Sequence, residues 1–208
     1  MVIEVTDQYV RLACMQAGRL CHFDVRPRDP RGPLLQEVNI PKRFLSFEAT
    51  VVIARREVIF KLLDLPSSDA GELRRMVDMQ IASQVPFTKD EMEYSLDVLQ
   101  TFEDGRSRVL VAVIEKKKAA WYFTEAQARG LRVGRMIISS SALVSACLRP
   151  RPEIQDDRSC HAFVCVDEGH SELCFILGRK MFFSKHFAVG LGGVMETDDP
   201  VLAREVVR

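Results

Sequence analysis

The 208-residue sequence lacks an excess of charge of either sign, because 29 Lys and Arg residues balance 29 Asp and Glu residues. A chain without net charge sets up no overall field that attracts nucleic acid or an anionic membrane surface. The sequence also lacks an apolar run of membrane-spanning length and a signal-peptide pattern at its N-terminus. We therefore expect no nucleic-acid partner and no membrane-spanning segment.

Cysteine pairs at metal-binding or redox spacing are absent as well. The six cysteines form no C-x-x-C motif, and several lie in apolar runs, where a reduced cysteine behaves as a small hydrophobic residue. They are Cys14, Cys21, Cys147, Cys160, Cys165 and Cys174. The spacing favours free thiols over a disulfide framework or a metal site, and it indicates a reducing, cytosolic compartment.

The sequence does contain alternating signals for strands and helices. Residues 2–15 form an extended run that mixes apolar and polar positions, whereas three prolines and a glycine within 26–33 exclude a helix or a central strand. The elements expected next are strands at 50–53 and 57–63, a helix at 70–85, strands at 92–102 and 109–114, a helix at 116–129 and a strand at 131–138. From residue 57 this order is β-α-β-β-α-β, which is typical of a ferredoxin-like module.

Local signals define the ends of these elements. Asp69 predicts a helix N-cap, with Glu72 as its capping-box partner. Alternation of apolar and polar residues over 92–102 predicts a half-buried strand, and Asp104-Gly105 is a strong hairpin turn. The sequence therefore predicts an α+β protein with at least two subdomains.

The second predicted helix has two further features. Lys116-Lys117-Lys118 at its start oppose the helix dipole, so contact with an acidic partner or lipid headgroups is an alternative to the solvated face that we favour. Trp121, Tyr122 and Phe123 cannot all face one core, because neighbouring residues point about 100° apart. We expect one of these aromatic residues to be exposed or to lie at a subdomain contact.

A glycine turn after an apolar run is the most informative segment for function. The run 164–166 leads into Asp167-Glu168-Gly169-His170-Ser171, and two more extended runs lead to residues 190–193. Glycine lets a backbone approach an anion closely, and an acid such as Asp167 holds Mg²⁺ through water. The candidate nucleotide-binding residues are Asp167, Gly169, His170, Ser171, Gly192 and Gly193. A plain β-hairpin that binds nothing is the alternative, because Asp-x-Gly is common in turns.

Three segments, taken in order, carry a family resemblance. Residues 61–66 (KLLDLP), 81–87 (IASQVPF) and 90–94 (DEMEY) are similar to an L-E-L-P … I-P-F … D-E … Y pattern. Residues 110–115 and 128–131 are similar to a V-A-A … A-G-L stretch, and residues 140–143 to the segment that follows it. The Asp167 hairpin, together with residues 190–193, is similar to a V-D-I-G … L-G-G pattern. In these features the chain resembles the PilM family of type IV pilus assembly, related to FtsA and to the cytoplasmic part of the type II secretion protein GspL.

The resemblance implies a partial actin-like (FtsA-like) ATPase fold of the α+β or α/β class. The ferredoxin-like module would be inserted into the first lobe. The expected parts are 1–49 for the start of the first lobe, 50–135 for the inserted module, 136–158 for the return and a linker, and 159–208 for the start of the second lobe. The remaining lobe and the adenosine-binding loop would follow, so we expect an N-terminal fragment or a reduced homologue.

The function that the resemblance implies is a non-enzymatic cytoplasmic scaffold peripheral to the inner membrane. It would serve a type IV pilus or a related type II secretion complex and hold the cytoplasmic tail of a bitopic, PilN-type membrane protein. Membrane association would then run through that partner, and a homo-oligomer is left open. We expect peptide contacts near Val85 and Phe87, with simple core packing of both as the alternative.

An actin-like ATPase with slow or no turnover, binding ATP and Mg²⁺ with Asp167 as the Mg²⁺ acid, is the alternative function. Two departures from the family's phosphate loops weigh against it. Thr6 stands where the family has glycine, followed by the acid Asp7, and Glu168 adds a second acid beside the expected phosphate. No catalytic residue is assigned, because no His or Glu stands out as a water-activating base.

Overall fold

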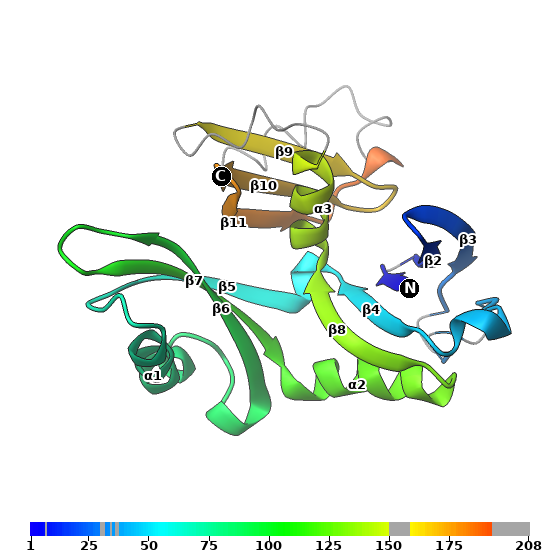
Figure 1. Ribbon diagram of the computed structural model, residues 1–208, viewed down its shortest axis with the longest axis horizontal. Helices are drawn as coiled ribbons and strands as arrows, with labels where there is room; N and C mark the ends of the chain where they lie inside the picture. Colours follow the sequence, from blue (N-terminus) through cyan, green and yellow to red (C-terminus); the bar gives the residue numbers. More distant parts are fainter. Residues whose placement is uncertain (7, 30–31, 34, 36–37, 150–158, 193–208) are drawn as a thin grey trace.

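The computed structural model describes residues 1–6, 8–29, 32–33, 35, 38–149 and 159–192. Within these residues the strands form three sheets (Figure 1), which we name sheet A (order β3-β2-β1-β4-β8), sheet B (β5-β7-β6) and sheet C (β11-β10-β9). One helix packs on each, namely α2 on sheet A, α1 on sheet B and α3 on sheet C. Asp7, Gly193 and most of the predicted linker lie outside the described residues.

Sheet A combines antiparallel and parallel pairing. Its strands are β1 (Val2–Val5), β2 (Tyr9–Gln16), β3 (Arg19–Pro27), β4 (Glu48–Ile53) and β8 (Arg132–Ile138). The first three pair antiparallel, whereas β1, β4 and β8 run parallel to one another. The stretch predicted as one extended run over 2–15 is therefore two strands of a hairpin.

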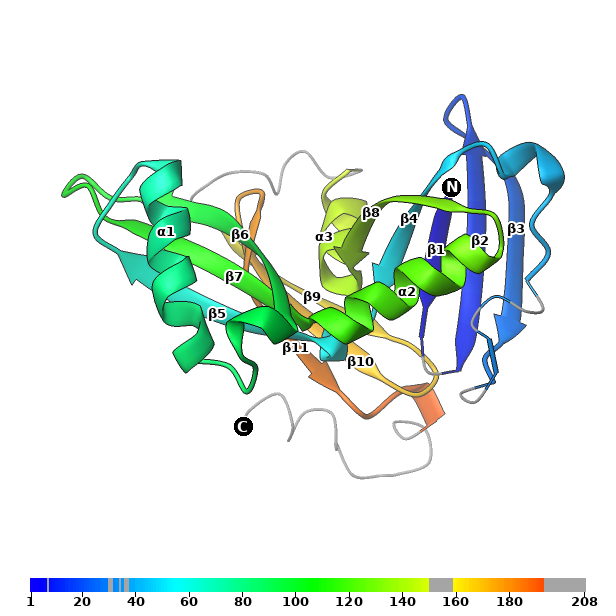
Figure 2. The same cartoon turned by 90° about the horizontal axis from the view of Figure 1, so that it is seen from below.

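The two faces of sheet A differ in chemistry. On β2, alternate residues Val10, Leu12 and Cys14 are buried in the core beneath α2 (Lys116–Ala128), whose buried residues are Ala119, Tyr122 and Ala126. Figure 2 shows α2 lying across the strands of sheet A. Because side chains alternate along a strand, Glu4, Tyr9 and Arg11 lie on the opposite face of the hairpin. Those side chains form the candidate site described below.

Sheet B and α1 form a separate small layer. The strands are β5 (Val58–Leu65), β6 (Met92–Thr101) and β7 (Ser107–Glu115), all antiparallel, and α1 spans Ala70–Gln80. The predicted alternation in β6 is confirmed, because Met92, Tyr94, Leu96 and Val98 all pack in the cluster under α1. The predicted turn is also confirmed, with Gly105 at φ +79° between β6 and β7.

The start of α1 confirms one prediction and corrects another. Asp69 is the N-cap, and its carboxylate accepts a hydrogen bond from the Glu72 N–H at 2.9 Å. The side chain of Glu72 does not return to the backbone of Asp69 as a capping box requires. It accepts a hydrogen bond from the Ser67 hydroxyl at 2.6 Å, because the buried Ser67 precedes the helix and offers a closer donor.

The predicted ferredoxin-like module needs a correction in its last strand. The element order is as expected, but β8 does not join β5, β6 and β7 in one sheet. It runs parallel to β4 in sheet A, because α2 carries the chain back across that sheet, and Val133, Met136 and Ile138 pack on the sheet A core. The compact part around sheet B therefore has three strands and one helix, and the strand predicted at 50–53 lies outside it.

Sheet C is a three-stranded meander packed against α3. Its strands are β9 (Cys160–Val166), β10 (Ser171–Leu177) and β11 (Lys180–Phe187), and α3 spans Ser139–Leu148. Val144 and Leu148 of α3 pack against Cys174 and Ile176 of β10. Short 3₁₀ turns occur at Lys42–Phe44, Arg55–Glu57, Ile81–Ser83 and Lys89–Glu91.

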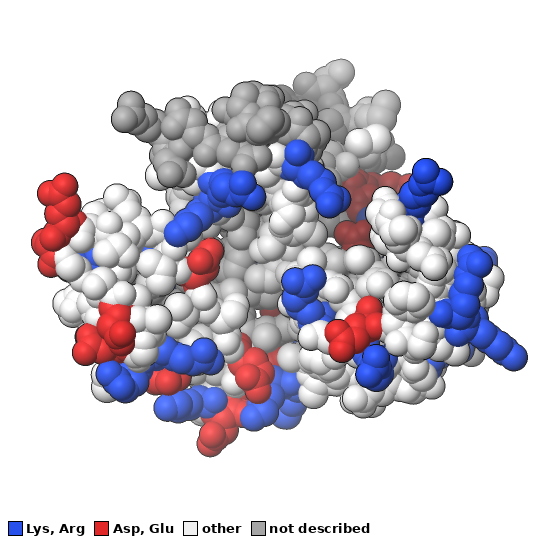
Figure 3. Space-filling view, viewed as in Figure 1, with Lys and Arg blue, Asp and Glu red and all other residues white. Residues whose placement is uncertain are grey.

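The described surface agrees with the balanced composition. Figure 3 shows basic and acidic side chains interspersed over one face of the molecule. All six cysteines are free, with Cys14 and Cys174 buried and Cys21, Cys160 and Cys165 exposed. Among the described residues, every helix is too short or too polar to cross a membrane.

Candidate functional site

The first part of the candidate site is the connection between β1 and β2. Thr6 is buried, and its hydroxyl both accepts from the Tyr9 N–H at 2.9 Å and donates to the Tyr9 carbonyl at 3.1 Å. The Thr6 N–H donates to the same carbonyl at 2.9 Å. This turn therefore satisfies the N–H groups of Thr6 and Tyr9 within itself.

The second part is the turn between β9 and β10. The Asp167 N–H donates to the carbonyl of His170 at 2.8 Å, and the Glu168 N–H donates to the Asp167 carboxylate at 2.9 Å. A Cβ added to Gly169 would lie 2.8 Å from Nε2 of Gln8, so the amide of Gln8 fills the space beside this glycine. The two turns are in direct side-chain contact.

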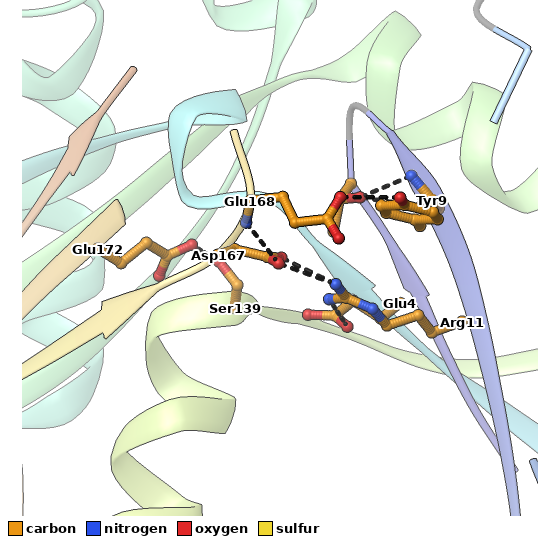
Figure 4. A network of polar contacts seen from close by, with 8 residues as sticks. Glu4, Tyr9, Arg11, Ser139, Asp167, Glu168 and Glu172 are labelled. Atoms are coloured by element: carbon orange, nitrogen blue, oxygen red, sulfur yellow. Dashed lines mark hydrogen bonds and ion pairs between the residues drawn. The ribbon is translucent and has the colours of Figure 1, made fainter. Parts of the chain in front are cut away.

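An ion pair of Arg11 joins these two turns (Figure 4). Its guanidinium donates to Glu4 at 2.9 Å and, through the other nitrogen, to both oxygens of Asp167 at 2.9 and 3.1 Å. Glu4 and Arg11 are cross-strand partners in the β1–β2 hairpin, on the polar face of sheet A. The side chains of Arg11 and Asp167 are 27% and 23% exposed, so water screens this pair less than a surface pair.

The pKa values of both groups follow from this geometry. Burial acts to raise the pKa of Asp167, but the hydrogen bond from the Glu168 N–H and the guanidinium of Arg11 outweigh it and hold that pKa below its ordinary value. Burial acts to lower the pKa of Arg11, but its hydrogen bonds to Glu4 and Asp167 raise it. The ion pair is therefore charged throughout the neutral range.

A second contact lies beside the ion pair. The Tyr9 hydroxyl donates to Glu168 at 2.8 Å, and this hydrogen bond raises the pKa of Tyr9. Figure 4 shows Tyr9 and Arg11 reaching from the same strand toward Glu168 and Asp167. We call these two contacts, Arg11–Asp167 and Tyr9–Glu168, the latch.

The latch does not fit a bound Mg²⁺–nucleotide. Both oxygens of Asp167 accept hydrogen bonds from Arg11, whereas a Mg²⁺ acid has to offer its oxygens to the hydrated ion. The guanidinium of Arg11 pairs with two carboxylates, those of Glu4 and Asp167, and the carboxylate of Glu168 follows Asp167 in the same turn, so the local charge is negative where a phosphate would lie. We therefore assign no chemical step to ATP or Mg²⁺ here.

The other predicted nucleotide-binding residues also have partners within the protein. Ser171 is buried and its hydroxyl donates to the Val189 carbonyl at 2.6 Å, and the ring of His170 lies 5.3 Å from that of His186. The N–H of Gly192 donates to the Glu168 carbonyl at 3.4 Å. Gly193 lies outside the described residues. Asp167, Gly169, His170 and Gly192 do lie close together, as the sequence predicts, but on a contact made by the protein itself.

A buried polar network lies behind the latch. Glu172 is buried on β10, and its carboxylate accepts hydrogen bonds from Ser139 and, at 3.0 Å, from Ser140 at the start of α3. The hydroxyls of Ser140 and Ser184 are also hydrogen-bonded at 3.2 Å, and Arg55 donates to the carbonyl of Ser184 at 2.9 Å. These contacts hold sheet C against the end of β8 and the segment after β4.

A separate groove of about 500 Å³ lies between sheets A and B. Most of the side chains around it are apolar. The lining residues are Ile53, Val58, Glu93, Tyr94, Ser95, Ala112, Ile114, Lys116, Ala119, Ala120, Phe123, Met136, Ile137 and Ile138. A hollow of about 240 Å³ shares Ser95, Ala112 and Ile138 with it and extends it toward sheet C. Sequence reasoning did not find this groove.

The aromatic residues of α2 are divided between the core and the groove. Ala120 is exposed and Phe123 half-buried, and both line the groove. Tyr122 is instead the buried aromatic of this helix. Of the three neighbouring aromatic residues, Phe123 is therefore the one that lines the groove between sheets A and B.

The residues predicted to bind a peptide lie elsewhere. Val85 and Phe87 are half-buried and pack on the cluster beneath α1, with Leu73, Val77 and Ile81 at its centre. Of the lysine run, Lys118 pairs with Glu57, whereas Lys116 lies 3.8 Å from Glu93 at the rim of the groove. Val85 and Phe87 as peptide contacts stay a prediction.

Comparison with solved structures identifies the class of protein first. The chain has an actin-like ATPase fold, since a Bacteroides thetaiotaomicron protein described in those terms matches 99% of this chain and 74% of its own, with a TM-score of 0.56 and 11% identity. The fold class predicted from the sequence is thereby confirmed. No family model matches the sequence, and no curated protein matches it either.

Two particular structures are similar to this chain in more specific ways. A chain of the PilM–PilN type IV pilus biogenesis complex gives a TM-score of 0.71 at 16% identity, covering 99% of this chain and 67% of its own. The cytoplasmic domain of EpsL, an inner-membrane component of the type II secretion system of Vibrio cholerae, gives a TM-score of 0.59 at 12% identity. This match covers 95% of this chain and 74% of the EpsL domain. The predicted resemblance to this group is confirmed at the level of the fold.

Proposed function

We propose that this protein is a non-enzymatic cytoplasmic scaffold of a type IV pilus or related type II secretion assembly complex. Fold similarity to the PilM–PilN complex and to the EpsL cytoplasmic domain supports this role. In this proposal the protein lies at the inner membrane through a partner rather than through a segment of its own. Its partner is a bitopic membrane protein of the PilN type, which presents a short cytoplasmic tail.

The apolar groove between sheets A and B is the observation that carries the proposal. Among the described strands, β6 is an edge of sheet B and β8 is an edge of sheet A, and both line the groove. An edge strand offers unpaired backbone N–H and C=O groups, so an extended peptide can add to it as a further strand. Side chains such as Ile114, Phe123 and Met136 then receive the apolar residues of the peptide.

The chemistry of the groove also suggests what the peptide looks like. The floor is apolar, and the pair Lys116–Glu93 at its rim supplies one charge of each sign. The occupant is therefore an extended segment with alternate apolar residues. A strongly charged segment would lose hydration in the groove without gaining matched partners.

Two alanines on α2 give a matched test. Both Ala120 and Ala128 are exposed, but Ala120 lines the groove and Ala128 does not. The probe is a fluorescein-labelled peptide with the sequence of the cytoplasmic tail of a PilN-type protein from the same organism, and the readout is fluorescence anisotropy. We expect Ala120→Glu to weaken binding at least tenfold, because it places a charge against an apolar ligand, and Ala128→Glu to leave it unchanged.

The competing location near Val85 and Phe87 is tested in the same assay. Phe87→Ala, with its melting temperature measured in parallel, removes the larger of the two side chains. Loss of binding in Phe87→Ala but not in Ala120→Glu moves the site to the end of α1. If neither wild type nor any variant binds the tail, the peptide-binding scaffold is wrong.

A further inference from the structure

We propose that the latch replaces Mg²⁺–nucleotide as the bridge between the two turns, with Arg11 serving as a built-in cation for Asp167. The contact between the β1–β2 hairpin and sheet C then closes without any ligand. The protein consequently does not take up Mg²⁺–ATP between these turns, and its fold is held closed permanently rather than by a nucleotide cycle.

Arg11 lies where a Mg²⁺ ion held by Asp167 would have to bind. A hydrogen bond between a guanidinium and a carboxylate is stronger than one between neutral groups, because both partners are ionised. One nitrogen of Arg11 binds both oxygens of Asp167 and another binds Glu4, so a single cation pairs with two acids, one on β1 and one in the turn after β9. A metal ion would have to displace Arg11 from Asp167 and leave a half-buried guanidinium with a single partner.

Several backbone N–H groups of the two turns are already engaged in hydrogen bonds within the protein. A phosphate-binding turn presents N–H groups that are not otherwise engaged. Here the N–H groups of Thr6 and Tyr9 close their own turn, and that of Asp167 closes the other. The N–H of Leu191 donates to the Asp167 carbonyl at 2.8 Å, in addition to the bond already described for Gly192.

The position of Gln8 completes the argument. The space that a missing Cβ leaves at Gly169 is the close approach that a phosphate would need, and the Gln8 amide occupies it. Glu168, the acid that replaces an apolar residue of the family pattern, is held by Tyr9. Of the departures from a phosphate site that the structure describes, Glu168 has its partner across the contact, whereas Thr6 is hydrogen-bonded within its own turn.

The test combines ligand binding with a double-mutant cycle. Isothermal titration of Mg²⁺–ATP and of Mg²⁺–ADP into the wild-type protein is expected to give no saturable heat. In thermal unfolding, Arg11→Met and Asp167→Ala are each expected to lower the melting temperature by roughly 2–4 °C. The double variant is expected to lose no more than the worse single variant, because one removed partner already breaks the contact.

An exposed ion pair provides the control cycle. Arg108 donates to both oxygens of Asp64 at 2.7 and 2.8 Å within sheet B, where both side chains are more than 40% exposed. Because water screens these exposed charges, Arg108→Met and Asp64→Ala are expected to show a smaller effect and a smaller coupling than the pair of Arg11 and Asp167, although their contact is bidentate. Saturable Mg²⁺–ATP binding that Asp167→Ala abolishes overturns the inference, and so do strictly additive losses for Arg11→Met and Asp167→Ala. Neither result affects the outcome of the peptide-binding assay with Ala120→Glu and Ala128→Glu. The proposal of a latch and the proposal of a peptide-binding scaffold can therefore be refuted independently.

Discussion

Gly190 lies directly against the backbone of Glu168, and the ends of sheet C are thereby brought together. A Cβ on Gly190 would overlap the carbonyl oxygens of both Glu168 and Asp167. The hydrogen bond from Leu191 to the Asp167 carbonyl fixes this approach. The close approach of residue 190 to the turn at Asp167 and Glu168 therefore requires a glycine. The same turn carries the two acids of the latch.

The first prediction concerns this close approach. Gly190→Ala is expected to destabilise the protein by about 1–3 kcal/mol, because the new methyl group forces the two backbone segments apart. Gly192→Ala is the matched control, since its Cβ would lie 3.9 Å from the Glu168 carbonyl, an ordinary contact. Urea unfolding followed by circular dichroism measures both. Equal stability of the two variants would contradict the close packing described here.

A second prediction concerns the buried acid Glu172. Ser140→Ala removes a hydroxyl that donates to this carboxylate, and hydrogen bonds to charged groups contribute about 1.5–3 kcal/mol. Ser145→Ala on the same helix is the control, because its exposed hydroxyl donates to the Ser141 carbonyl within α3. We expect the control to stay within about 0.5 kcal/mol of wild type. The measurement is the free energy of unfolding, and a neutral Ser140→Ala would show that Glu172 does not depend on it.

The third prediction is a pH dependence. The folded pKa of Asp167 is below its ordinary value of about 3.9, so its ion pair stabilises the protein above that pH. The stabilisation is lost as the pH falls through the lowered folded pKa. The difference in unfolding free energy between wild type and Asp167→Ala should therefore be constant from pH 7 to 5 and shrink below pH 4. A difference that grows on acidification would reverse the sign and refute the pairing.

A fourth prediction uses the cysteines. Burial raises the pKa of Cys174 to about 11, and the thiolate is the reactive form, so this residue should resist thiol reagents in the folded protein. Cys21 and Cys160 are exposed and should react first. Timed labelling with an aromatic disulfide reagent, mapped by mass spectrometry with and without urea, tests the order. Labelling of native Cys174 at the rate of Cys21 would show that sheet C opens readily.

Much of the local structure was predictable from the sequence, because its causes lie within a few residues. The N-cap at Asp69 and the turn at Asp104-Gly105 depend on neighbouring groups. The alternation over β6 depends on one buried face. The partner of β8, by contrast, depends on where α2 returns the chain, and no local pattern encodes that choice between two sheets.

The candidate site was predictable in part. Asp167, Gly169 and Glu168 stand out in the sequence, but their partner Arg11 lies 156 positions before Asp167 and carries no motif. The groove is harder still, because it is assembled from β6, β7, α2 and β8, each of which has another face in a core. The mixed polarity of the first strands was a signal for Arg11, since a polar side chain on a central strand needs a partner.

The junction between β8 and α3 has a mechanical consequence. Ile138 lines the groove, and the next residue, Ser139, binds Glu172 of sheet C. One peptide bond thus separates the wall that a peptide would touch from the hydroxyl that anchors the other sheet. A ligand that pulls β8 sideways must stretch the hydrogen bonds of Glu172, so force applied at the groove reaches sheet C without any moving loop.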